Sequence, residues 1–232
     1  MSRFSASQIP LLVLFGLLLL GLWPTHGMGS RETPLRIPFQ PTVTYGEGYG
    51  EEAVAQQAQS RFALKLFDHW LRQQPRENLF FSPLSIRLAL SLLYNGAAGE
   101  TQAAMAKVLE AQELSLNELN WTQAQMVRWL AERSQTAGPI QVQMANGLWV
   151  DTTLTLRPPF LQALATYYQA VANRVELGSP QTVQAINRWV AERTQGKIDR
   201  LVDRLGREDR MVLLNAIYFR GKWTQPFDPA LT

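Results

Sequence analysis

The chain has 232 residues, of which 46% are hydrophobic and 18% are charged, a composition typical of a globular protein. The formal charge is only +3 and the lysines and arginines form no run, which argues against a nucleic-acid-binding protein. There is no cysteine and there are two histidines, His26 and His69. Disulfides and thiolate chemistry are therefore excluded, a zinc site or a Ser-His-Asp centre is disfavoured, and we expect no metal and no cofactor.

The chain begins with the layout of a secretory leader. A short positively charged start precedes the apolar run Leu11–Leu22, and Pro24 ends that run. This pattern predicts a signal peptide over residues 1–27 and a secreted protein. The run is short for a membrane-spanning helix, which takes about 20 apolar residues, and an uncleaved signal anchor tethered to a membrane is the alternative. Residues 28–52 lack periodicity and predict a flexible lead-in.

A single folded domain is expected from residue 53 to residue 232. Its first predicted helix covers residues 53–74, and Pro75 ends it. Leu64, Phe67 and Leu71 fall on one face of a 3.6-residue period. His69 lies off that face, which indicates a surface or boundary histidine with no ligand partner.

The next helix carries the clearest sequence signals. Ser82 and Pro83 suit a cap and a first helical position. Apolar residues wrap around all sides of this helix, so we expect it to be buried on most faces at the centre of a large domain. They are Leu84, Ile86, Leu88, Ala89, Leu90, Leu92 and Leu93.

Periodicity and turn residues place the remaining elements. Further helices are predicted at 100–109, 116–133, 158–168 and 180–194, and strands at 78–81, 140–150, 173–177 and 211–219. The strand Met211–Phe219 is apolar on both alternating faces, as expected of a strand that is covered on both sides. Arg128 and Arg133 lie near Glu132 on a helix and predict a solvated face, with no heparin binding.

Several segments of the chain, in order, resemble the serpin family. They are Asn78–Ile86, Asn95–Thr101, Ala145–Val150, Ile186–Val190 with Thr194–Ile198, and Leu214–Trp223 with Pro226–Asp228. These segments are similar, in turn, to the start of the family's central helix B, the turn after it, strand 2A, helix F with its exit, and strand 3A with the breach. The resemblance implies an α+β serpin fold of three β-sheets with eight or nine helices, truncated here after strand 3A.

The family resemblance also implies a function. Serpins inhibit serine proteases, and sometimes cysteine proteases, by inserting a cleaved reactive-centre loop between strands 3A and 5A of sheet A. The loop and strand 5A are absent from the 232 residues. A non-inhibitory serpin that acts as a carrier or chaperone is the alternative. The resemblance implies a monomer that is not an enzyme, and Ser82 lies in no G-x-S-x-G elbow that would make it a nucleophile.

Two groups of site residues follow from the resemblance. Ser82, Ser85 and Asn215 match the shutter, where hydroxyls meet an amide beneath the sheet, and Trp223 and Thr232 match the breach, where the loop first enters. From the residues alone, Ser82 is equally an N-cap and Asn215 a satisfied core amide. Because strand 5A is absent from these residues, we expect the strand Met211–Phe219 to lie at an unpaired sheet edge, which is an aggregation hazard.

Overall fold

The computed structural model describes residues 11–18, 49–73, 76, 79, 81–135, 140–206 and 208–221. Their strands are β1 (Leu11–Leu18), β2 (Ile140–Asp151), β3 (Val171–Val175) and β4 (Met211–Gly221). Their helices are α1 (Tyr49–Gln73), α2 (Pro83–Tyr94), α3 (Gly99–Val108), α4 (Leu116–Gln135), α5 (Pro158–Tyr168) and α6 (Pro180–Arg193). Among these helices none is long and apolar enough to cross a membrane.

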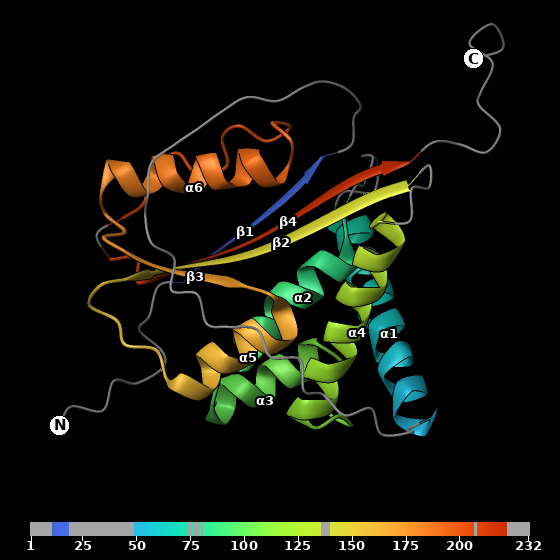
Figure 1. Ribbon diagram of the computed structural model, residues 1–232. Helices are drawn as coiled ribbons and strands as arrows, with labels where there is room; N and C mark the ends of the chain where they lie inside the picture. The colour runs from blue at the N-terminus through green and yellow to red at the C-terminus, as the bar shows by residue number, and fades with distance from the viewer. Residues whose placement is uncertain are drawn as a thin grey trace, which may run out of the picture.

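The strands form one sheet that separates two layers of helices, in the order β1-β4-β2-β3 (Figure 1). Helix α6 covers one face, and α1 to α5 gather on the other (Figure 1). The strand predicted at 211–219 is β4, which lies inside the sheet and contacts α2, as its two apolar faces indicated. The prediction that α2 is buried on most faces is also confirmed.

The pairing of the central strands brings two asparagines together. β2 and β4 run antiparallel, from Ile140 opposite Gly221 to Val150 opposite Met211. In this register Asn146 lies opposite Asn215. β3 pairs with β2 in parallel from Gly147 onward and begins two residues earlier than predicted.

The outer edge of β4 is occupied. The apolar run predicted as the centre of a leader forms β1, which pairs in parallel with β4 from Leu11 opposite Met211 to Leu18 opposite Tyr218. The prediction that β4 would be an unpaired edge is therefore wrong for this chain. The physical reason is that a free strand edge offers a row of backbone donors and acceptors to any extended segment that reaches it. The leader over residues 1–27 stays a prediction.

Two details of the first helices differ from the sequence expectation. Leu64, Phe67 and Leu71 are 68%, 46% and 41% exposed, so the described residues do not cover the apolar face of α1. The helix instead buries the side chains of Ala55, Ala58 and Phe62. Periodicity identifies a face but cannot say which neighbour covers it. Of the predicted strand 78–81, Leu79 and Phe81 are described and lie in no strand.

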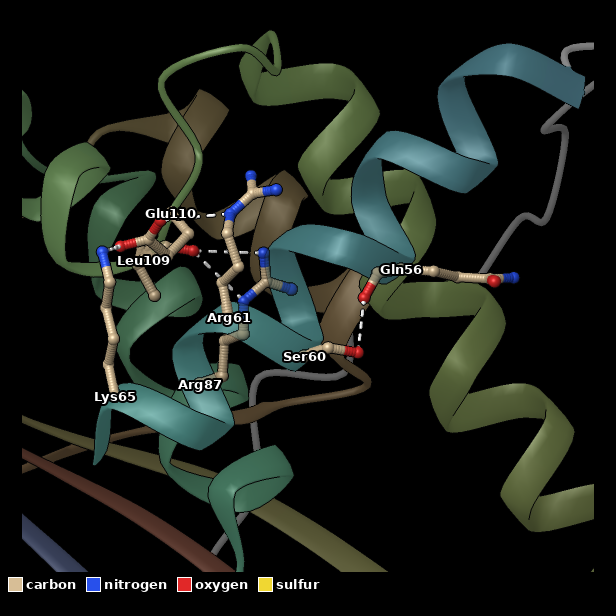
Figure 2. Close-up of polar contacts among 7 residues, drawn as sticks. All are labelled: Gln56, Ser60, Arg61, Lys65, Arg87, Leu109 and Glu110. Atoms are coloured by element: carbon tan, nitrogen blue, oxygen red, sulfur yellow. Dashed lines mark hydrogen bonds and ion pairs between the residues drawn. The ribbon is translucent and has the colours of Figure 1, made fainter. Parts of the chain in front are cut away.

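A buried arginine joins α2 to its neighbours. Arg87 is 0% exposed, and its Nε and Nη2 both donate to the carbonyl of Leu109, each at 3.3 Å (Figure 2). Its Nη1 donates to Oε1 of Gln59 on α1 at 3.0 Å. Burial lowers the pKa of Arg87 to about 10, so the guanidinium remains charged at neutral pH. Sequence reasoning considered the apolar residues on the sides of this helix and missed the arginine.

The turn after α3 is also held from α1. Glu110 has a φ of 55°, and its carboxylate accepts from Nε of Arg61 at 3.3 Å and from Nζ of Lys65 (Figure 2). The Lys65 hydrogen bond is the main cause that lowers the pKa of Glu110, and Arg61 adds to it. This ion cluster packs the middle of α1 against the α3–α4 turn, away from the buried amides beneath the sheet.

Candidate functional site

The predicted shutter residues meet at the start of α2. Ser82 is the N-cap, and its Oγ accepts from the backbone N–H of Ser85 at 3.2 Å. Ser85 lies in the first turn of the helix, and its hydroxyl donates to Oδ1 of Asn215 on β4. Ser82 therefore acts as a helix cap that positions Ser85, and Ser85 makes the contact with the strand.

Asn215 continues this chain of hydrogen bonds into the next strand. Its Nδ2 donates to Oδ1 of Asn146 at 2.6 Å, and Nδ2 of Asn146 donates to the backbone carbonyl of Tyr168 at 2.8 Å. Asn215 is 1% exposed, and Asn146 and Ser85 are also buried. Each amide both accepts and donates, so removing any one member leaves a buried partner unsatisfied, at a cost of about 1–3 kcal/mol.

The surroundings of this chain are apolar. Leu213 and Leu148, which lie two residues from the asparagines on their respective strands, belong to the same core cluster as Leu88 and Leu92 of α2. A hydrogen bond in such an interior is electrostatically stronger than one in water, and its loss is not compensated by solvent. The polar chain therefore favours one particular placement of β4 and β2 over α2.

Sequence reasoning found part of this site. It identified Ser82, Ser85 and Asn215 and missed Asn146, although Asn146 is a polar residue within an otherwise strand-forming segment. The missing information is the register, because only the antiparallel pairing of β2 with β4 places the two amides opposite each other. The predicted breach residues, Trp223 and Thr232, lie outside the described residues.

The described residues offer little for catalysis. His69 is exposed, and its Nε2 lies 3.0 Å from Nε2 of Gln73 on the surface of α1. In the described part of the chain no group of three His, Cys, Asp or Glu side chains could hold a metal ion. The chemistry that this site supports is the making and breaking of buried hydrogen bonds between helix and sheet.

Comparison with known proteins identifies the architecture. The family model described as "Serpin (serine protease inhibitor)" matches residues 57–232. Among curated relatives, a serine protease inhibitor of the rat, Rattus norvegicus, is 35% identical over 171 residues, which cover 72% of this chain and 40% of that protein. Human corticosteroid-binding globulin is 32% identical over 217 residues, which cover 91% of this chain and 51% of that protein.

Solved structures agree with the sequence matches. The native-state crystal structure of the thermophilic serpin tengpin aligns with a TM-score of 0.71 and 29% identity, over 85% of this chain and 49% of tengpin. The chain thus spans about half the length of the proteins it matches.

Proposed function

The chain belongs to the serpin family, and from this premise we propose that it forms part of a serine-type protease inhibitor in which a cleaved loop inserts beside β4 as a new strand. The single observation that supports this is the buried hydrogen-bond chain Ser85–Asn215–Asn146 between α2 and the two central strands. A polar chain at this place holds the sheet closed by a few bonds that can be broken and remade.

Strand insertion is a physical process that needs an acceptor edge. β4 offers such an edge to β1, over eight paired residues in the described structure. An inserting loop would use the same kind of main-chain hydrogen bonds, which is the strand-addition mode of recognition. The energy would come from a native state that is kinetically held above a more stable one, with the shutter residues Ser82, Ser85 and Asn215 setting part of the barrier.

The partner and location follow from the same proposal. The target is a serine protease, or a cysteine protease as in some members of the family, and the inhibitor acts as a monomer when its serpin domain is complete. The predicted leader would send the protein to the extracellular space, with no lasting membrane association once it is removed. Trp223 and Thr232 are proposed as breach residues at the point where insertion begins.

A second candidate is a carrier without inhibitory activity. It is favoured by one observation, the 32% identity to human corticosteroid-binding globulin over 91% of this chain. A carrier would use the same fold and the same closed sheet, but cleavage of its loop would not be followed by insertion.

The test uses the protein with a complete serpin domain. It is incubated with trypsin-like and chymotrypsin-like serine proteases, and the products are separated on a denaturing gel. An inhibitor is expected to give a denaturant-resistant complex that retains the protease. Loop cleavage by a non-target protease should also raise the thermal midpoint strongly. A cleaved protein with no complex and an unchanged midpoint would contradict the inhibitor and favour the carrier.

A further inference from the structure

Tyr168 connects two hydrogen-bond chains that do not otherwise meet among the described residues. Its backbone carbonyl accepts from Asn146, at the end of the chain that begins at Ser85. Its hydroxyl donates to Oδ1 of Asn120 on α4 at 2.8 Å. The residue is 1% exposed and lies at the C-terminal end of α5.

The second chain ends on the same helix from which the first begins. Nδ2 of Asn120 donates to Oδ1 of Asn95 at 2.7 Å, and Nδ2 of Asn95 donates back to Oδ1 of Asn120 at 2.9 Å. Asn95 is the C-cap of α2, and its Nδ2 also donates to the carbonyl of Ser91 in the last turn at 2.9 Å. The sheet is therefore bound to both ends of α2, through Ser85 at one end and through Tyr168 at the other.

The tyrosine hydroxyl is suited to a lasting contact. Burial raises the pKa of Tyr168 well above its ordinary value, so the hydroxyl keeps its proton and remains a donor across the physiological range. The following residue, Gln169, adopts a left-handed φ of 49° and closes the helix with a backbone hydrogen bond to Leu164. The position of the carbonyl and that of the hydroxyl are thus fixed by the same helix end.

We propose that Tyr168 is a positioning residue for the movement of the central strands, a second latch that must release together with the Ser85–Asn215 contact. The inference rests on the proposed function, because it concerns the strand movement that insertion requires. If β2 and β4 shift over α2, Asn146 carries the carbonyl of Tyr168 with it, and the hydroxyl must leave Asn120 or pull on it. Breaking the shutter at Ser85 alone leaves this second connection in place.

Hydrogen exchange on the chain itself tests this proposal without a protease. Tyr168→Phe removes only the hydroxyl, and with it the donation to Asn120 at 2.8 Å and a longer contact in which the hydroxyl accepts from Nδ2 of Asn95 at 3.4 Å. We expect the amides of β4 from Leu214 to Ile217 to exchange about fivefold faster, the factor that one net hydrogen bond of average strength provides. The hydrogen bonds of the hydroxyl in the described structure go to Asn120 and Asn95, not to β4. Tyr167→Phe is the matched control, because the Tyr167 hydroxyl makes no hydrogen bond within the described part of the chain.

A second control separates coupling from general destabilisation. Ile186→Val, on the sheet-facing side of α6 and therefore over the opposite face of the sheet, removes one methyl group from a fully buried residue. It is expected to lower global stability by a similar amount. The proposal requires that Tyr168→Phe accelerates exchange in β4 more than Ile186→Val does at equal global stability. Acceleration confined to α4 and α5, or no greater than in Ile186→Val, overturns it.

The outcome for Tyr168 is distinguishable from that for inhibition. If β4 responds to Tyr168→Phe but the complete protein forms no protease complex, the latch stands and the inhibitor proposal fails. If the complete protein is an inhibitor and hydrogen exchange in β4 does not accelerate on Tyr168→Phe, the role proposed for Tyr168 is refuted and the inhibitor proposal stands.

Discussion

The two faces of the central sheet are built differently, although neighbouring residues of the same strand form both. On the α6 face, Val212 and Leu214 pack with Trp149, and Trp149 meets Trp189 of α6 edge to face with ring centroids 4.9 Å apart. On the α2 face, Asn215 lies in the hydrogen-bond chain with Ser85 and Asn146.

This difference shows how one sheet can be stabilised by apolar packing on one face and released by breaking a few hydrogen bonds on the other. Apolar packing is non-directional, so the α6 face tolerates small displacements with gradual loss of contact. A buried amide either has its partner or leaves it unsatisfied, which makes the α2 face respond in a stepwise manner. Apolar packing on the α6 face therefore opposes any displacement of β4. The hydrogen bonds on the α2 face decide at which displacement the strand is released.

Removing β1, the strand that covers the outer edge of β4, should have the largest effect. A chain that starts at Met28 lacks β1, which leaves β4 with an open edge while both faces stay intact. We expect concentration-dependent self-association, measured by size-exclusion chromatography with light scattering. Val13→Pro in the full chain should act in the same direction, because proline removes a backbone donor from β1. A shortened chain that stays monomeric at high micromolar concentration would show that β4 needs no cover.

Truncation on the apolar face comes next. Leu214→Ala should lower the free energy of unfolding by about 3 kcal/mol, because Leu214 is fully buried and its removal leaves a cavity under α6. Urea denaturation followed by circular dichroism measures the loss. Leu64→Ala on the exposed face of α1 is the matched control and should change little. Equal effects at the two sites would refute the difference in burial.

Truncation of a side chain on the α2 face should lower the free energy of unfolding somewhat less than truncation of Leu214. Asn215→Ala is expected to lower the free energy of unfolding by about 2 kcal/mol, because Ser85 and Asn146 each lose a partner. Asn173→Ala is the control, since its half-buried side chain makes no hydrogen bond with any described residue.

A double variant sharpens that prediction. Adding Ser85→Ala to Asn215→Ala removes one of the two orphaned groups, so the double variant should lose less than the sum of the single ones. Strict additivity in urea denaturation would mean that the two side chains do not act as a unit.

The smallest effect is expected at the ion cluster outside the sheet. Glu110→Gln should cost about 0.5 kcal/mol at pH 7, because the pairs with Lys65 and Arg61 are partly solvated. The folded pKa of Glu110 is lowered, so its contribution is present above the unfolded pKa and is lost as the pH falls through the folded value. The difference between the natural chain and the variant should therefore disappear in acid and shrink in high salt.

The exposed Glu113 supplies the control for the ion cluster. Glu113→Gln changes the same charge next to the same turn, on a side chain with no ion pair among the residues described. Chemical denaturation at several pH values compares the two variants. If Glu113→Gln shows the same pH-dependent difference as Glu110→Gln, the effect reflects net charge and not the pairs with α1.

Local patterns in the sequence were sufficient for the main elements and for the family. The cap at Ser82–Pro83, the largely apolar α2 and the doubly apolar strand at 211–219 are each encoded by a short stretch of neighbouring residues. The structure has them where the patterns placed them. The α+β serpin architecture was implied by the resemblance of several short segments to the serpin family. Such features depend on backbone propensity and on the burial of neighbouring side chains, which a short segment determines by itself.

Only the tertiary structure decided which polar groups meet and which apolar faces are covered. Ser85 and Asn215 are 130 residues apart in the chain, and Asn146 and Asn215 are 69 apart. No local pattern specifies a strand register across such distances, and the roles of Asn146, Tyr168 and Arg87 depend on that register and on helix packing. The exposure of the apolar face of α1 could not be predicted for the same reason. Periodicity determines which side of a helix a side chain lies on, but only the neighbouring elements of the folded chain determine whether water reaches it.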